Sequence, residues 1–147
     1  MKKFSFRLEP ALKHRITLEE KAVLELANWR RRYAELEEQL EAMRLYRNQI
    51  EQQAAELEGD IPPVLLKTLS QHLQWVADQE DVCARELACL ALRVEEARQA
   101  AIAASTARRS LERLKEKKLE EYLASAAAEA QKELDDHSAV RAARASA

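Results

Sequence analysis

The chain has 147 residues with a single glycine, three prolines and a formal net charge of -2. One glycine excludes glycine-rich phosphate loops and leaves few turns for a sheet, while the near-neutral charge gives no overall attraction to nucleic acids. Charged residues make up 34% and aromatic residues 5%, a mixture typical of long helices and coiled coils rather than of a domain with a conventional core.

The first half of the chain carries apolar residues at alternating spacings of four and three, the pattern of a helix that packs against another helix. Pro10 fits the first turn of such a helix, and no helix breaker follows before Leu57. The sequence therefore predicts a helix over about 8–58, in which the roughly 48 residues from Pro10 to Leu57 span about 72 Å. Arg47 interrupts its apolar stripe, which consists of Leu26, Trp29, Tyr33, Leu36, Leu40, Met43, Ile50, Ala54 and Leu57 and extends back through Ala22, Glu19 and Leu12 to Leu8.

A short break over 59–63 follows this helix. Gly59 suits the left-handed position after a helix end, and Asp60 is expected to cap the next helix. Pro62 and Pro63 cannot continue the first helix. These residues predict a turn.

The second half repeats the same spacing and predicts a helix over about 64–136. Glu80 interrupts its stripe, which consists of Leu66, Leu69, Leu73, Val76, Cys83, Leu87, Leu90, Val94, Ala97, Ala101 and Ala104. The tail over 137–147 has no stripe, and we expect it to fray.

Two matching stripes joined by a short turn predict an all-α fold, a single antiparallel coiled-coil hairpin over 1–147. With the turn near residue 61, Leu40 faces Cys83 and Trp29 faces Val94. Arg47 and Glu80 fall in adjacent layers, where an ion pair would fix the register more than it would add stability. A hairpin covers each stripe only in part, so we expect a partner to complete the structure.

No catalytic, cofactor-binding or metal-binding constellation is present in the sequence, and we expect no enzymatic activity. His14, His72 and His137 lie far apart, and Glu133 with His137 lacks a third ligand. Cys83 lies on the second stripe and is expected to be a small core residue, whereas no role follows for Cys89. No run of 18 apolar residues occurs, and the basic start lacks the features of a signal peptide, so a cytoplasmic protein is expected.

Three exposed features are expected. The first is the aromatic pair Phe4 and Phe6. The second is a cluster near the turn in which Leu65 and Trp75 fall off the stripe, either packing locally or forming a docking patch. The third is the basic stretch over 108–118, either a solvated flank or a docking site for an acidic protein surface.

The opening segment over 4–15, FSFRLEPALKHR, resembles the start of the bacterial flagellar export protein FliJ family. The family pattern is aromatic-x-aromatic-basic-Leu, then Leu-x-x-Arg, then an acidic pair like Glu19 and Glu20. The segments over 111–118 and 131–136 look like the family's C-terminal stretch. The family often carries a tryptophan before that stretch, and here 100–107 has none.

The resemblance implies a hairpin similar to the central stalk of rotary ATPases, in a flagellar type III export apparatus. Its implied partners are the hexameric export ATPase, the membrane export gate and export chaperones, on the inner face of the cell membrane and without insertion. The resemblance carries over Leu69 and Leu73 as gate-binding residues, and Trp75 of the cluster near the turn is predicted to join them. The implied ATPase-facing residues, assigned by position, are Phe4, Phe6, Arg7, Leu8, Leu12, Arg15, Arg108, Arg109, Arg113, Lys117 and Lys118.

Three other functions compete with this interpretation. The stalk of a virulence type III injectisome is closely related, although the aromatic opening favours the flagellar system. A scaffold homodimer of two extended chains is another, and the turn over 59–63 argues against it. An arm that binds RNA or DNA through the basic blocks is the third, and it would be sensitive to salt.

Overall fold

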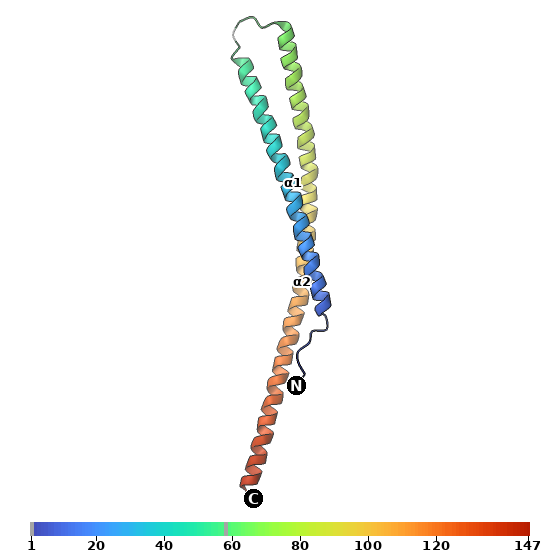
Figure 1. Ribbon diagram of the computed structural model, residues 1–147, viewed down its shortest axis with the longest axis vertical. Coiled ribbons are helices and arrows are strands. Elements are labelled where there is room, and N and C mark those ends of the chain that lie inside the picture. Colours follow the sequence, from blue (N-terminus) through green and yellow to red (C-terminus); the bar gives the residue numbers. More distant parts are fainter. Residues whose placement is uncertain (1, 58) are drawn as a thin grey trace. The chain divides into compact units, whose positions relative to one another are not determined.

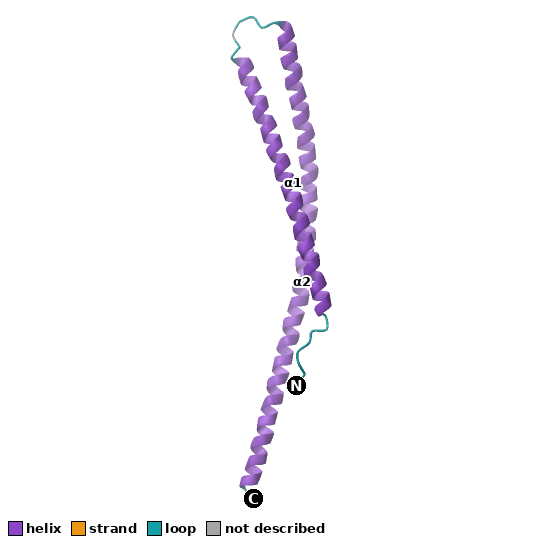
Figure 2. Ribbon diagram, in the orientation of Figure 1, coloured by secondary structure: helices purple, strands orange, loops and turns teal. Residues whose placement is uncertain are grey.

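The computed structural model describes residues 2–57 and 59–147. Glu58, at the expected end of the first helix, and Met1 lie outside the described residues. The regular structure described consists of α1 (Glu9–Ala55) and α2 (Pro63–Ala145), without a strand in the described ranges (Figure 2). The prediction of an all-α chain with two long helices is confirmed. Tertiary contacts divide the chain into two units. The hairpin unit is Glu20–Ile102, and the terminal unit consists of the residues before Glu20 together with Ala103–Ala147.

Helix α1 starts where the sequence predicted a start. The amide of Glu9 donates to the carbonyl of Phe6 at 3.1 Å, and that of Leu12 to the carbonyl of Leu8 at 2.9 Å. Pro10 lies in the first turn, where its missing N–H has no intrahelical partner to lose. The negative charge of the Glu9 carboxylate also interacts favourably with the positive, N-terminal end of the helix dipole.

The break between the helices contains one confirmed and one wrong prediction. Gly59 has a φ of 93°, the left-handed conformation expected of it. Asp60 does not cap α2, because Pro62 directly precedes the helix and its carbonyl accepts the amides of Leu65 and Leu66. Pro63 is the first helical residue, a position in which proline is favoured.

In the hairpin unit, α1 and the first part of α2 run antiparallel from this break (Figure 1). The predicted stripes form their interface, which we call the seam. From Ala22 to Ala54 every stripe residue of α1 is buried or half-buried, and so is every one of α2 from Leu69 to Ala101. Leu57 and Leu66, next to the break, are about half exposed and are exceptions to the prediction.

Contacts across the seam agree with the predicted register to within one helical turn. The thiol of Cys83 lies 3.7 Å from the carbonyl of Leu36, and a guanidinium nitrogen of Arg47 lies 2.9 Å from a carboxylate oxygen of Glu80. Cys83 and Glu80 are both buried, as a seam position requires. The expected Arg47–Glu80 ion pair is therefore present.

The terminal unit is held together differently. Lys115 pairs with Glu9 at 2.8 Å, Arg108 pairs with Glu19, and the hydroxyl of Tyr122 donates to the carbonyl of Lys2 at 2.7 Å. Among the described residues of this unit, Leu12 is the one buried apolar side chain, with 4% of its surface exposed. Ion pairs and a hydrogen bond to the backbone thus accompany apolar burial at this end of the chain.

Helix α2 continues to Ala145, well past the expected end at 136. The residues over 137–145 are rich in alanine and arginine, contain no glycine or proline, and favour helix without tertiary contacts. All of them are exposed, in accord with the absence of a stripe.

Candidate interaction surfaces

Within residues 2–57 and 59–147, no group of three or more His, Cys, Asp or Glu side chains could hold a metal ion. No helix in the described part of the chain is long and apolar enough to cross a membrane. The chain presents several surfaces that could contact other proteins.

The first surface lies at the N-terminal segment of the terminal unit. Phe4 and Phe6 are half-buried rather than exposed, which corrects the expectation from the sequence. The ring centroid of Phe4 lies 5.5 Å from that of Tyr122 at an angle of 51°. A hollow of about 460 Å³ is lined by Phe4, Ser5, Phe6, Arg7, Leu8 and Lys118. The structure therefore brings five of the predicted ATPase-facing residues together.

Sequence reasoning did not identify Tyr122 as part of this surface. Its ring contacts Phe4, and its hydroxyl fixes the backbone at Lys2. The predicted register, extended past the first helix, places position 122 opposite the N-terminal segment and could have revealed this contact.

The basic stretch over 108–118 divides into paired and unpaired positions. Hydrogen bonds to Glu19 and then to Glu112 raise the pKa of Arg108, and Lys118 pairs with Glu121 at 2.8 Å. Arg109, Arg113 and Lys117 are exposed, and their spacing of four places them along one face of α2. Within the described part of the chain, none of these three makes an ion pair of the kind that Arg108, Lys115 and Lys118 make. The pKa of Glu121 is nevertheless lowered by the hydrogen bond from Lys118 and, to a smaller extent, by the charge of Lys117. We call this row of three the cation row.

The remaining predicted ATPase-facing residues differ in accessibility. Leu12 is 4% exposed, so its side chain packs inside the unit and cannot form part of a surface. Arg15 is exposed, and Leu8 is 39% exposed at the rim of the hollow. Leu12 was misassigned because it follows the same spacing as the stripe, which is a signal for burial.

A second surface lies beside the break in the hairpin unit. Leu69 and Leu73 are half-buried in the seam, and both border an open hollow of about 400 Å³. Arg47, Glu51 and Leu66 line the same hollow. Trp75 is 58% exposed and does not line it.

Trp75 instead belongs to an aromatic cluster with His72 and Tyr46. The indole stacks on the imidazole at 6.1 Å, and Nε2 of His72 lies 3.0 Å from the hydroxyl of Tyr46. The cluster joins the two helices near the break and holds the exposed indole in place. No sequence signal marks Tyr46, because it lies next to the stripe and not on it.

The comparisons with known proteins point to one family. The family model described as "Flagellar FliJ protein" matches residues 4–147. The comparisons with curated proteins and with solved structures give no match. The family match agrees with the resemblance carried by the opening motif.

Proposed function

The chain belongs to the flagellar FliJ family and is a component of the flagellar protein export apparatus, and from this premise we propose that it is a non-enzymatic stalk. In this proposal it links the hexameric export ATPase to the membrane export gate and escorts export chaperones. It would associate peripherally with the inner face of the cell membrane through the gate.

The observation that supports this proposal most is the distribution of the candidate surfaces. The hollow at the N-terminal segment and the cation row belong to the terminal unit, whereas Leu69, Leu73 and Trp75 belong to the hairpin unit. Candidate surfaces made of different residues in different units give one chain two possible contacts. A stalk needs such surfaces and needs no active site.

The cation row is the part of the terminal unit that we propose for the ATPase. Like charges at a spacing of four residues on a helix are mutually destabilising, so an acidic partner surface would stabilise the row. Arg108 and Lys118 have carboxylate partners within the chain and contribute less. This assigns the contact to Arg109, Arg113 and Lys117.

The test measures ATP hydrolysis by the purified hexamer with and without this chain. We expect the chain to raise the rate, and the triple variant Arg109→Glu, Arg113→Glu, Lys117→Glu to lose the stimulation. A matched control, Lys132→Glu with Arg141→Glu and Arg144→Glu, makes the same change of charge at exposed positions of α2. Absence of stimulation and of co-sedimentation with the wild-type chain would refute the ATPase contact.

The gate contact is tested separately with the cytoplasmic part of the export gate. We expect Leu69→Ala with Leu73→Ala to reduce the free energy of binding to the gate by more than it reduces the free energy of unfolding. Both side chains border an open hollow, where a partner can contact them. Trp75→Ala should weaken binding with little effect on folding, since the indole is exposed. The matched control is Val23→Ala with Leu24→Ala, two exposed positions of α1, and equal loss of binding in the control would contradict the assignment.

A further inference from the structure

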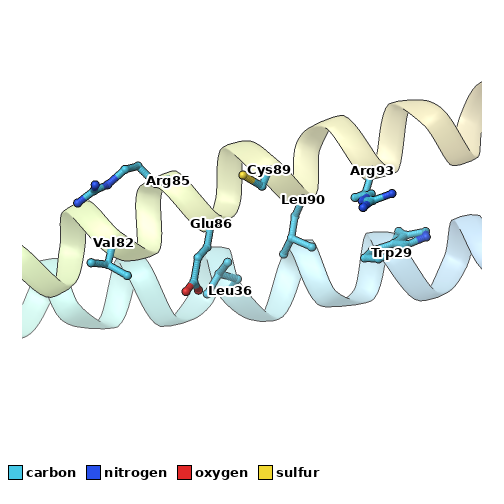
Figure 3. Close-up of a pocket in the computed structure, with 8 residues that line it drawn as sticks. All are labelled: Trp29, Leu36, Val82, Arg85, Glu86, Cys89, Leu90 and Arg93. Atoms are coloured by element: carbon cyan, nitrogen blue, oxygen red, sulfur yellow. The ribbon is translucent and has the colours of Figure 1, made fainter.

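A third surface, used by neither proposed contact, lies midway along the hairpin unit. Trp29 and Leu36 of α1 and six residues of α2 line a groove of about 580 Å³ (Figure 3). The apolar members from α2 are Val82, Cys89 and Leu90. This places Cys89, for which the sequence suggested no role, on the groove.

The charges around this groove are predominantly positive. Arg85 and Arg93 line it together with a single carboxylate, that of Glu86, and Arg93 also makes an exposed ion pair with Glu96 at 3.5 Å. The guanidinium of Arg93 lies 5.8 Å from the ring centroid of Trp29, and that of Arg32 lies 4.9 Å from it. Trp29 is therefore a half-buried aromatic anchor with two arginines held against its ring.

We propose that this groove binds an amphipathic helix of a partner protein, one with a row of leucine-type side chains flanked by acidic residues. A groove between two packed helices accepts the apolar row of a third helix at heptad spacing. Tryptophan and arginine are the residue types that contribute most to binding in such interfaces. Acidic flanks complement the three arginines.

A second copy of the chain is a poorer occupant than an acidic helix. In a symmetric dimer the same patch contacts itself, so two grooves would place their arginines opposite one another. Such like-charge contacts are unfavourable. The charge of the groove thus selects against self-association through this face.

Binding of a helix at the groove does not depend on the proposed stalk function, and its test needs neither the ATPase nor the gate. The chain has two tryptophans, so Trp75→Phe leaves Trp29 as the single emitter beside the groove. The probe is a designed helical peptide of about three heptads with a leucine row and glutamate flanks. A second peptide has the same leucine row with lysine flanks.

We expect the glutamate peptide to shift the emission of Trp29 and to bind at least about tenfold more tightly than the lysine peptide, a difference of about 1.4 kcal/mol. Arg32→Glu with Arg93→Glu should reverse this preference. The control pair Lys132→Glu with Arg141→Glu carries the same charge change on the terminal unit and should leave the preference unchanged. Circular dichroism checks that each variant keeps its helix content.

Thiol modification gives an independent measurement, because Cys89 is exposed and Cys83 is buried. The glutamate peptide should slow the reaction of Cys89 with a maleimide. Equal binding of both peptides, no emission shift, or unchanged reactivity of Cys89 would overturn the proposal. A shift that depends on the concentration of the chain alone would also overturn it, because a second copy would then occupy the groove.

Discussion

The hairpin unit and the terminal unit both consist of parts of α1 and α2, but different interactions stabilise them. Between α1 and α2 of the hairpin unit, a continuous apolar seam buries Leu40, Val76, Cys83 and Ala97. In the terminal unit, two ion pairs between α1 and α2 and the contact of Phe4 with Tyr122 accompany the buried Leu12.

This difference has consequences for stability. Apolar burial is insensitive to salt, whereas partly exposed ion pairs contribute about 0–1 kcal/mol and are screened by salt. The hairpin unit should therefore form the stable part of the molecule. The terminal unit should open at lower free energy.

The largest effect is expected from a cavity in the seam. Leu40 is 4% exposed, and Leu40→Ala should lower the free energy of unfolding by about 2 kcal/mol or more, the lower end of the range for buried leucine. Leu45→Ala is the control on the same helix, because Leu45 is 60% exposed and its loss should cost under about 0.5 kcal/mol. Thermal melts followed by circular dichroism measure both, and equal destabilisation would show that the seam does not carry the stability.

A comparable but smaller effect is expected at the Arg47–Glu80 pair. Arg47→Met leaves the buried carboxylate of Glu80 without its cation and should cost about 2 kcal/mol. The double variant Arg47→Met with Glu80→Leu should recover this loss, because an apolar pair fills the same positions without buried charge. A double variant as unstable as the single one would mean that the ion pair itself stabilises the hairpin.

In the terminal unit, Tyr122→Ala should release the N-terminal segment at a cost of about 1 kcal/mol. Hydrogen exchange of the amides over 9–19 should then accelerate, whereas exchange over 33–43 should not change. High salt should produce the same pattern in the wild-type chain by screening the pairs of Glu9 and Glu19. Uniform acceleration in both units would show that they unfold together.

The smallest effect concerns the exposed pair of Glu95 and Arg98. Hydrogen bonds from Arg98 and then from Gln99 lower the pKa of Glu95 from 4.5 to about 2. The carboxylate therefore favours the folded helix at neutral pH, and this contribution disappears as the pH falls from about 4.5 through about 2. A carboxyl NMR titration should give the low midpoint, and Arg98→Ala should return it toward 4.5.

The sequence predicted the hairpin unit well because heptad spacing is a local property of the chain. Each stripe residue from Ala22 to Ala54 faces the partner helix, since two packed helices repeat their contact every three or four residues. Gly59 was identified because left-handed backbone selects glycine. The Arg47–Glu80 pair followed from two polar interruptions that the predicted register places in adjacent layers.

The terminal unit and the groove were predicted poorly because their contacts join residues that share no periodic signal. Phe4 lies in a segment without helix, and its contact with Tyr122 depends on how the chain enters α1. The groove depends on which side of the seam Trp29, Val82 and Cys89 lie. The extension of α2 to Ala145 was missed because helix propensity alone, without a stripe, sustains it.

The sequence by itself determined that this chain forms two long helices with one turn, because periodicity, glycine and proline act locally. Only the tertiary structure decided which charges are available and which are paired, as with Arg109 and Arg108. It also decided that Trp29, Arg85 and Arg93 line one groove and that Arg32 lies against the Trp29 ring. Such arrangements depend on rotamers and on contacts between residues far apart in the chain, and a linear pattern does not encode these explicitly.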